Sequence, residues 1–330
     1  MKSKVKSSGM VNLKRSLKES VGVLAAIALI IVIMSFASPA FLSQDNIFNI
    51  LRQIAPTAII AFGMTFAILI GGIDLSVGSV QGFAGMAAVV AIITFGLPVW
   101  LGVIVGLTVG IVCGLFNGTM IALTKMPPFI VTMSMMSIAR GFTYIISGGA
   151  PIRILIPEYN IIGTGVLGPF SYPLIYAIVL FAIFWFVLNQ TKFGRHVYAV
   201  GGNQTAASFC GISIKKVQII VFAISGFLAG VTGIFLTARL FTGQPTLGMG
   251  AELDAIAAVV IGGTSFSGGR GRLFGTFLGA ILIGIIGNGM NLLNVSTFAQ
   301  MVTRGFIILI AVGLDMYTRS RTQRVKKIKV

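Results

Sequence analysis

The chain is built from recurring apolar stretches of about 18 or more residues, separated by short polar connections. A helix of that length crosses the roughly 30 Å hydrocarbon core of a bilayer. Because that core offers no water, a spanning segment must satisfy its own backbone hydrogen bonds. Stretches this long do so as helices rather than as strands of a barrel. The sequence therefore predicts an all-α, polytopic membrane protein.

The composition excludes a soluble protein of this size. Hydrophobic residues make up 56% and charged residues 9% of the chain, only seven residues are acidic, and the mean hydropathy is +1.00. The net charge of +17 does not indicate nucleic-acid binding. The basic residues gather in connections and tails, as in membrane proteins, and not on a face interleaved with aromatic residues.

Few side chains are available for catalysis or cofactor binding. His196 is the only histidine, which excludes a histidine-based metal cluster, and Cys113 and Cys210 imply no disulfide. The sequence also lacks a GxxxxGK[ST] phosphate loop, so the chain does not itself hydrolyse ATP by that route. We expect no metal, no cofactor and no catalytic residues.

Ten spans are predicted. The apolar run from Val21 to Phe36 is interpreted as an uncleaved first helix, because it is longer than the apolar core of a usual signal peptide and more spans follow. The two tails and the connections on the same side of the membrane carry 19 of the 24 basic residues, which predicts that both termini are cytoplasmic. Basic tails at 1–19 and 318–330 flank one membrane domain at 20–317. The predicted spans are 20–38, 46–70, 76–95, 98–123, 128–147, 171–190, 216–239, 252–266, 273–293 and 298–317.

Two of these spans are irregular. Pro56 should kink the second span. The eighth has only about fifteen residues, too few to cross the core at 1.5 Å per residue, and it follows the breaker-rich segment GQPTLGMG at 243–250. A short helix after an irregular segment favours non-helical backbone that faces protein or a water-filled cavity.

Small residues recur every four positions along several spans. This spacing lets helix backbones approach closely, either within one subunit or between subunits, and packing within the subunit is favoured. The recurring glycines are Gly102, Gly106, Gly110, Gly114 and Gly118, then Gly226 and Gly230, and then Gly271, Gly275 and Gly279.

A short motif appears twice, each time at the end of a predicted span. IGGIDLSVG begins at Ile70, and IGGTSFSGG begins at Ile261, 191 residues later. Both copies share two glycines followed by a large apolar residue, a serine, one further residue and a glycine. The match predicts two pseudo-repeated halves in parallel orientation.

The connection at 191–216 is too polar to span and too apolar for a linker. Asn203 followed by QTAASF predicts a short capped helix that ends at Gly211. Such a helix, between two spans on the cytoplasmic face, is interpreted as a docking element. An amphipathic helix resting on the membrane surface is the alternative.

These motifs carry a family resemblance that covers about 41–315. The chain resembles the permease subunit of a bacterial monosaccharide importer of the ATP-binding-cassette class, and the ribose-type permeases most. The most specific segments are NILRQ at 49–53, GGIDLSVG at 71–78, the FGR…GGN loop at 193–203, and QPT…ELDAIAAVVIGGTSFSGGRGR at 244–272.

The resemblance implies a particular set of partners. They are a second permease copy, an extracytoplasmic sugar-binding protein, and two cytoplasmic ATPase subunits or one fused tandem ATPase that bind the ATP. It also implies residence in the bacterial cytoplasmic membrane. Thr205 departs from the pattern, because an acid often stands there. The residues expected to couple the permease to its ATPases are Gly202, Asn203, Ala206, Ala207 and Gly211.

Polar residues inside spans are candidates for a translocation path. For Asp74 the alternative is a helix N-cap, and for Glu252 and Asp254 it is capping or an ion pair with Arg239. For the asparagines the alternative is hydrogen bonding between helices. The candidates are Asp74, Glu252, Asp254, Asn288 and Asn291; Asn294 shares the helical spacing of the last two.

Two other classes compete with this interpretation. An ion-coupled carrier would leave the docking-type loop unexplained, and a membrane-embedded enzyme would need a cluster of acid, base or metal-binding residues that the sequence lacks. The sugar is not determined by the sequence: ribose is the first expectation, with xylose, arabinose, galactose and inositol as alternatives.

Overall fold

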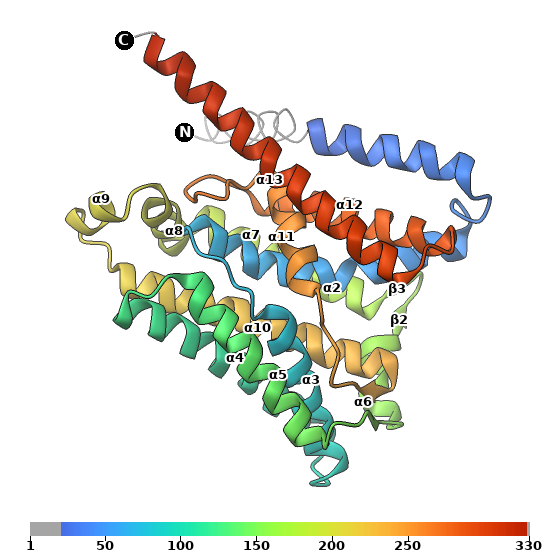
Figure 1. Ribbon diagram of the computed structural model, residues 1–330. Coiled ribbons are helices and arrows are strands. Elements are labelled where there is room, and N and C mark those ends of the chain that lie inside the picture. The colour runs from blue at the N-terminus through green and yellow to red at the C-terminus, as the bar shows by residue number, and fades with distance from the viewer. Residues whose placement is uncertain (1–20, 329–330) are drawn as a thin grey trace, which may run out of the picture.

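The computed structural model describes the backbone of residues 21–328 and the side chains of residues 21–313. These residues form an assembly of helices joined by short connections (Figure 1). The helices in chain order are Val21–Ala37, α2 Gln44–Leu69, α3 Val77–Ile93, α4 Val99–Thr124, α5 Pro128–Ser147, α6 Pro157–Thr164, α7 Tyr172–Gln190, α8 Lys192–Gly202, α9 Gln204–Phe209, α10 Ile214–Leu240, α11 Ala251–Ile261, α12 Leu273–Leu292 and α13 Thr297–Ile328.

A helix lies at each of the ten predicted span positions. Among the described residues, six helices are long and apolar enough to cross a membrane by length and composition: α2, α4, α5, α7, α10 and α12. The all-α, polytopic prediction is confirmed. The predicted tail at 1–19 lies outside the described residues, whereas α13 runs on to Ile328, beyond the predicted span end at 317.

Strand structure is confined to two small pairs. The strands β1 Ile152–Arg153 and β4 Thr242–Gly243 pair antiparallel, with Ile152 opposite Gly243. The second pair consists of β2 Val166–Leu167 and β3 Phe170–Ser171. The first pair anchors the segment that leads from α10 toward α11 against the connection that follows α5.

The segment before α11 is irregular, as predicted. Residues 241–250 contain turns and one short strand, and α11 has 11 residues, fewer than the fifteen expected. At 1.5 Å per residue it is about 16 Å long, roughly half of a membrane core. The rest of that crossing is non-helical backbone, which must be surrounded by protein or water.

The most extensive helix contact joins α4 to α10, which lie side by side (Figure 1). A methyl group added to Gly110 would meet the Gly226 carbonyl, and one added to Gly226 would meet the Gly110 carbonyl. The recurring glycines of α12 make the same kind of contact, since a methyl group added to Gly275 would meet the Gly262 carbonyl at the end of α11. These glycines therefore pack helices within the subunit, as predicted.

Pro56 lies inside α2, which continues through it to Leu69. Proline has no N–H to donate to the carbonyl four residues earlier, which belongs to Arg52. The Nη1 of Arg239, in the last turn of α10, donates to that carbonyl at 3.3 Å. An arginine that is far away in the sequence thus donates to the Arg52 carbonyl, which the proline leaves without its usual partner.

Both copies of the repeated motif end a helix in the same way. After α2, the Gly71 N–H bonds the Ile68 carbonyl and the next N–H bonds Ala67; after α11, the Gly263 N–H bonds Val260 and the next bonds Val259. Gly71 and Gly263 are both left-handed, with φ of 80° and 87°. The structural offset is 263 − 71 = 192, one more than the sequence match of 191. The division into two repeated halves stays a prediction.

Candidate functional site

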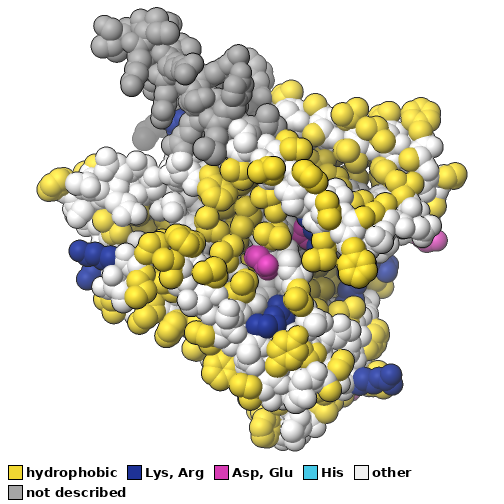
Figure 2. All heavy atoms as spheres, viewed as in Figure 1, with side chains coloured by type: hydrophobic (Ala, Val, Ile, Leu, Met, Phe, Trp, Pro, Cys, Tyr) yellow, Lys and Arg dark blue, Asp and Glu magenta, His cyan; other side chains and the backbone are white. Residues whose placement is uncertain are grey.

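Charged side chains meet on one face of the helix assembly. The helices α5, α11 and α13 lie toward the viewer in Figure 1. On this face, acidic and basic side chains lie together in a hollow ringed by hydrophobic ones (Figure 2). Four charged side chains of these helices are described: Arg140 of α5, Glu252 and Asp254 of α11, and Arg304 of α13. Charges within apolar spans are expensive to place in lipid and mark contact with water or protein.

Arg140 holds the irregular segment in place. Its Nη1 donates to the Pro245 carbonyl at 2.6 Å and to the Leu247 carbonyl at 2.8 Å. These carbonyls lie in non-helical backbone, so they have no helix partners of their own. The carboxylate of Glu252 lies close enough to attract the Arg140 guanidinium. One arginine of α5 thus joins the irregular segment to the start of α11.

The first turns of α3 are shaped to receive this segment. A methyl group at Gly78 would collide with the Glu252 carboxylate and the Gly248 carbonyl, and one at Gly82 would collide with the Leu247 carbonyl. The last glycine of GGIDLSVG is therefore required because backbone and a carboxylate approach it closely.

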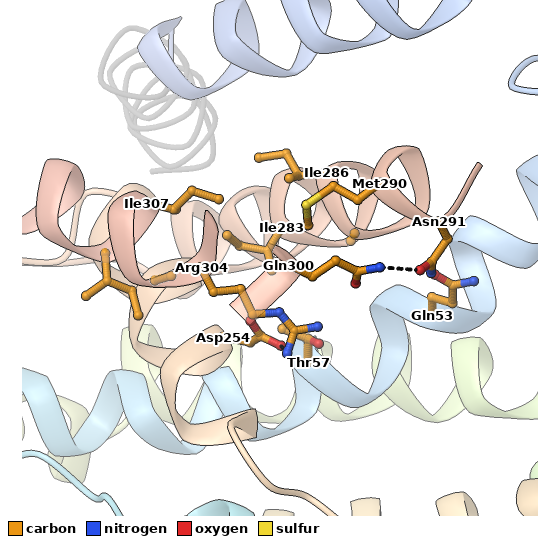
Figure 3. A pocket seen from close by; sticks show the side chains of 14 residues that line it. Gln53, Thr57, Asp254, Ile283, Ile286, Met290, Asn291, Gln300, Arg304 and Ile307 are labelled. Carbon is orange, nitrogen blue, oxygen red and sulfur yellow. Dashed lines mark hydrogen bonds and ion pairs between the residues drawn. The ribbon is translucent and has the colours of Figure 1, made fainter. Parts of the chain in front are cut away.

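Asp254 forms an ion pair with Arg304 of α13. The ion pair with Arg239, which the sequence offered as an alternative to a path role, does not form. The Asp254 Oδ2 lies 3.3 Å from Arg304 Nη1, and the two side chains are 16% and 35% exposed. Arg239 is instead engaged with the Arg52 carbonyl at the end of α10. The ion pair closes one side of a cavity between α2, α11, α12 and α13 (Figure 3).

This cavity has a volume of about 120 Å³. Asn291 lines it, and its Oδ1 accepts a hydrogen bond at 2.9 Å from the Nε2 of Gln300, which also bonds the Val295 carbonyl (Figure 3). The polar residues around the cavity come from four helices: Gln53 and Thr57 from α2, Asp254 from α11, Asn291 from α12, and Gln300 and Arg304 from α13.

Two candidates from the sequence lie elsewhere. Asn288 is 1% exposed and exchanges two amide hydrogen bonds with Asn46, at 3.0 and 2.8 Å, so it joins α12 to α2. Asp74 is also 1% exposed, and its Oδ1 accepts hydrogen bonds from the backbone N–H and hydroxyl of Ser76. Ser76 directly precedes α3 but makes no side-chain cap bond, so the carboxylate that accepts a backbone N–H at this helix start is that of Asp74. Both candidates occupy packing positions away from the cavity.

The predicted short helix, α9, forms directly after α8, on the side of the protein where α2 and α11 end. The Asn203 Oδ1 caps α9 by accepting from the Ala206 N–H at 2.9 Å, and Gly211, with φ of 79°, ends it. Ala207 faces inward at 4% exposure, whereas Phe209 projects outward at 88%. The helix, its cap and its end are confirmed; α8, which precedes it, was not predicted.

The α8 helix is joined to the ends of α2 and α11. The Tyr198 hydroxyl donates to the Gly271 carbonyl at 2.9 Å, and the Gly269 N–H donates to the Leu69 carbonyl at 2.8 Å. Gly201 lies against both Leu69 and Gly269, with no space for a side chain. We call this meeting of α8, the end of α2 and the 262–272 connection the inner junction.

The sequence indicated some of these residues and missed others. Arg140 and Arg304 are charged residues inside predicted spans, and that position is the signal that points to them. Gln53, Thr57 and Gln300 carry no comparable signal, because neutral polar residues also serve packing. Among the described residues, no three His, Cys, Asp or Glu side chains are grouped as a metal site would need.

The helices and the charged face define a multi-pass membrane permease. The chain belongs to the family described as branched-chain amino acid transport system / permease component, whose model matches residues 46–312. It is 44% identical to the ribose import permease protein of Haemophilus influenzae over 88% of this chain and 91% of that protein. It is 44% identical to the Bacillus subtilis ribose import permease protein over 90% and 92%, and 39% identical to the D-allose transport system permease protein of Escherichia coli over 89% and 90%.

Proposed function

We propose that this chain is the permease subunit of an ATP-driven importer of a monosaccharide, with ribose as the first substrate to test. The observation that carries the proposal is whole-length similarity: the relatives named for ribose and D-allose transport match about nine-tenths of this chain. It is a transport subunit and not an enzyme. A relative named for xylose transport is 35% identical, which makes xylose the second candidate alongside allose.

The charged face formed by α5, α11 and α13 is proposed to line the translocation path. A face with Arg140, Glu252 and Asp254 at membrane depth is costly against lipid. A second copy of the permease would cover it and leave a wet path between the two. Within this proposal, Asn291 contributes from the cavity behind that face.

The inner junction and α9 are proposed to transmit the state of the partner ATPases. Phe209 projects outward from α9, and Gly202 at the end of α8 has open space beside it. The residues proposed for coupling are Gly202, Asn203, Ala206, Ala207 and Gly211. Two ATPase subunits or one tandem ATPase bind the ATP in the cytoplasm, and a sugar-binding protein docks at the other end. Both termini are proposed to lie on the cytoplasmic side of the bacterial inner membrane.

Reconstituted vesicles test the proposal. They contain the permease together with a partner ATPase and a ribose-binding protein, with ATP enclosed on the ATPase side. We expect uptake of radiolabelled ribose that depends on both ATP and the binding protein. Uptake driven by an ion gradient without ATP would assign the chain to a carrier class instead.

A further inference from the structure

The cavity behind Asp254 and Arg304 has the chemistry of a ligand site and not of a packing contact. Two polar pairs that join α2 to α12 are mutually satisfied and sealed: Asn46 and Asn288 exchange two hydrogen bonds, and the buried Thr65 and Thr276 hydroxyls bond at 2.8 Å. By contrast, Gln53 and Thr57 are half-buried on the cavity wall. Within the described part of the chain, neither of their side chains hydrogen-bonds another protein group.

The charges of the cavity cancel. Asp254 and Arg304 neutralise each other at 3.3 Å, and the other polar groups on its walls are amides and a hydroxyl. A charged solute would need an unpaired counter-charge here, or would have to break the ion pair. Amide groups both donate and accept hydrogen bonds, as sugar hydroxyls do. The chemistry therefore favours a neutral solute that carries several hydroxyl groups.

The size and opening of the cavity set how such a solute would bind. A volume of about 120 Å³ is well above the roughly 10–15 Å³ that one water molecule needs, so the cavity has room for several water molecules. Arg304 remains 35% exposed, so the cavity is not sealed. A solute in the hollow of the charged face would place one edge, with two or three hydroxyls, into this space in exchange for water.

We infer that the cavity lined by Gln53, Thr57, Asn291 and Gln300 is a subsite for the hydroxyl edge of a neutral polyol that passes along the charged face. This inference rests on the proposed function and extends it by naming the residues that read the substrate. Leucine and other zwitterionic solutes are not expected to bind here, despite the name of the wider family.

Gln53→Leu and Thr57→Val test the subsite. Each replaces a polar side chain by an apolar one of similar size, and neither breaks a hydrogen bond between described residues of the protein. Thr65→Val is the matched control: it is the same substitution on the same helix, two turns away, at a packing contact. In the reconstituted vesicles with ribose, we expect each test variant to slow uptake roughly fivefold, the effect of about one lost hydrogen bond. ATP hydrolysis stimulated by the binding protein should persist. The control should transport within about twofold of the wild-type rate.

Wild-type uptake by both test variants at normal protein levels would overturn the subsite. If wild-type vesicles transport no sugar, the proposed function fails, and a binding measurement on the full-length permease alone still decides the subsite. Saturation-transfer NMR with ribose as the probe should give a signal that Gln53→Leu and Thr57→Val reduce and Thr65→Val does not. Equal signals in all variants, or transfer to leucine instead of ribose, would contradict the inference.

Discussion

The hydroxyl of Tyr198 in α8 donates a 2.9 Å hydrogen bond to the carbonyl of Gly271, just before α12. Burial raises the pKa of Tyr198 to about 12, so the hydroxyl keeps its proton at physiological pH and can always donate. Two residues away in the same connection, Gly269 bonds Leu69 at the end of α2. The helix next to the proposed docking element is therefore tied to the connection between α11 and α12, and that connection is tied in turn to the end of α2.

Tyr198→Phe removes this tie and leaves the ring in place. The lost bond costs about 1 kcal/mol, too little to unfold a membrane domain. We expect less sugar moved per ATP hydrolysed, measured as uptake and phosphate release in the same vesicles. Tyr176→Phe, a half-buried tyrosine of α7, is the control and should keep the wild-type ratio. An unchanged ratio in Tyr198→Phe would separate the inner junction from coupling.

Gly201 and Gly202 form a matched pair at the same junction. A methyl group at Gly201 would collide with the Leu69 carbonyl, whereas one at Gly202 meets nothing within 4 Å. Gly201→Ala should therefore lower the thermal midpoint of the detergent-purified permease and reduce transport, and Gly202→Ala should fold like the wild type. Equal behaviour of the two variants in a melting assay would show that the close contact at Gly201 does not matter.

The amide pair formed by Asn46 and Asn288 is predicted to serve stability alone. Asn288→Ala leaves the buried Asn46 Oδ1 without its donor, which costs about 1–3 kcal/mol, while Asn46 Nδ2 still donates to the Phe41 carbonyl. We expect a lower thermal midpoint, with the uptake rate per folded molecule unchanged. The double variant, which removes both amides, should recover part of the loss. A specific fall in uptake with normal stability would return Asn288 to the path.

Arg239 and Pro56 should depend on each other. Arg239→Met removes the donor to the Arg52 carbonyl, and Pro56→Ala supplies a backbone N–H in its place. We expect Arg239→Met to destabilise the protein by about 1 kcal/mol and the double variant to lose less than that. A double-mutant cycle from thermal unfolding measures the difference. Additive effects would mean that the proline and the arginine act separately.

Membrane orientation can be tested with single cysteines in a background that lacks Cys113 and Cys210. A cysteine at Ile161, which is 51% exposed on α6, should react with an impermeant thiol reagent from outside. Asn160 beside it is buried, so it suits the test less well. A cysteine at the exposed Gln204 should react only in inside-out vesicles. Labelling of position 204 from outside would reverse the proposed topology.

Local signals in the sequence predicted the helices and α9 well, because each depends on nearby residues. Asn203 and Gly211 cap and end α9 through contacts within a few positions, and the apolar runs mark the spans in the same way. The partner of Asp254 could not be predicted, since Arg304 is fifty residues away and its approach depends on how α11 and α13 pack. Neutral cavity residues such as Thr57 differ from packing residues such as Thr65 only by what surrounds them.

The glycine contacts between α4 and α10 limit where this protein can move. At Gly110 and Gly226 backbone lies directly on backbone, so neither helix can rotate about its own axis without driving an adjacent side chain into the other. The two helices must therefore travel together as one rigid block. Opening and closing of a passage is left to elements held by longer, exchangeable side-chain contacts, namely α13, whose Arg304 pairs with Asp254 of α11. The alternation between states is then a motion of this helix against a fixed wall.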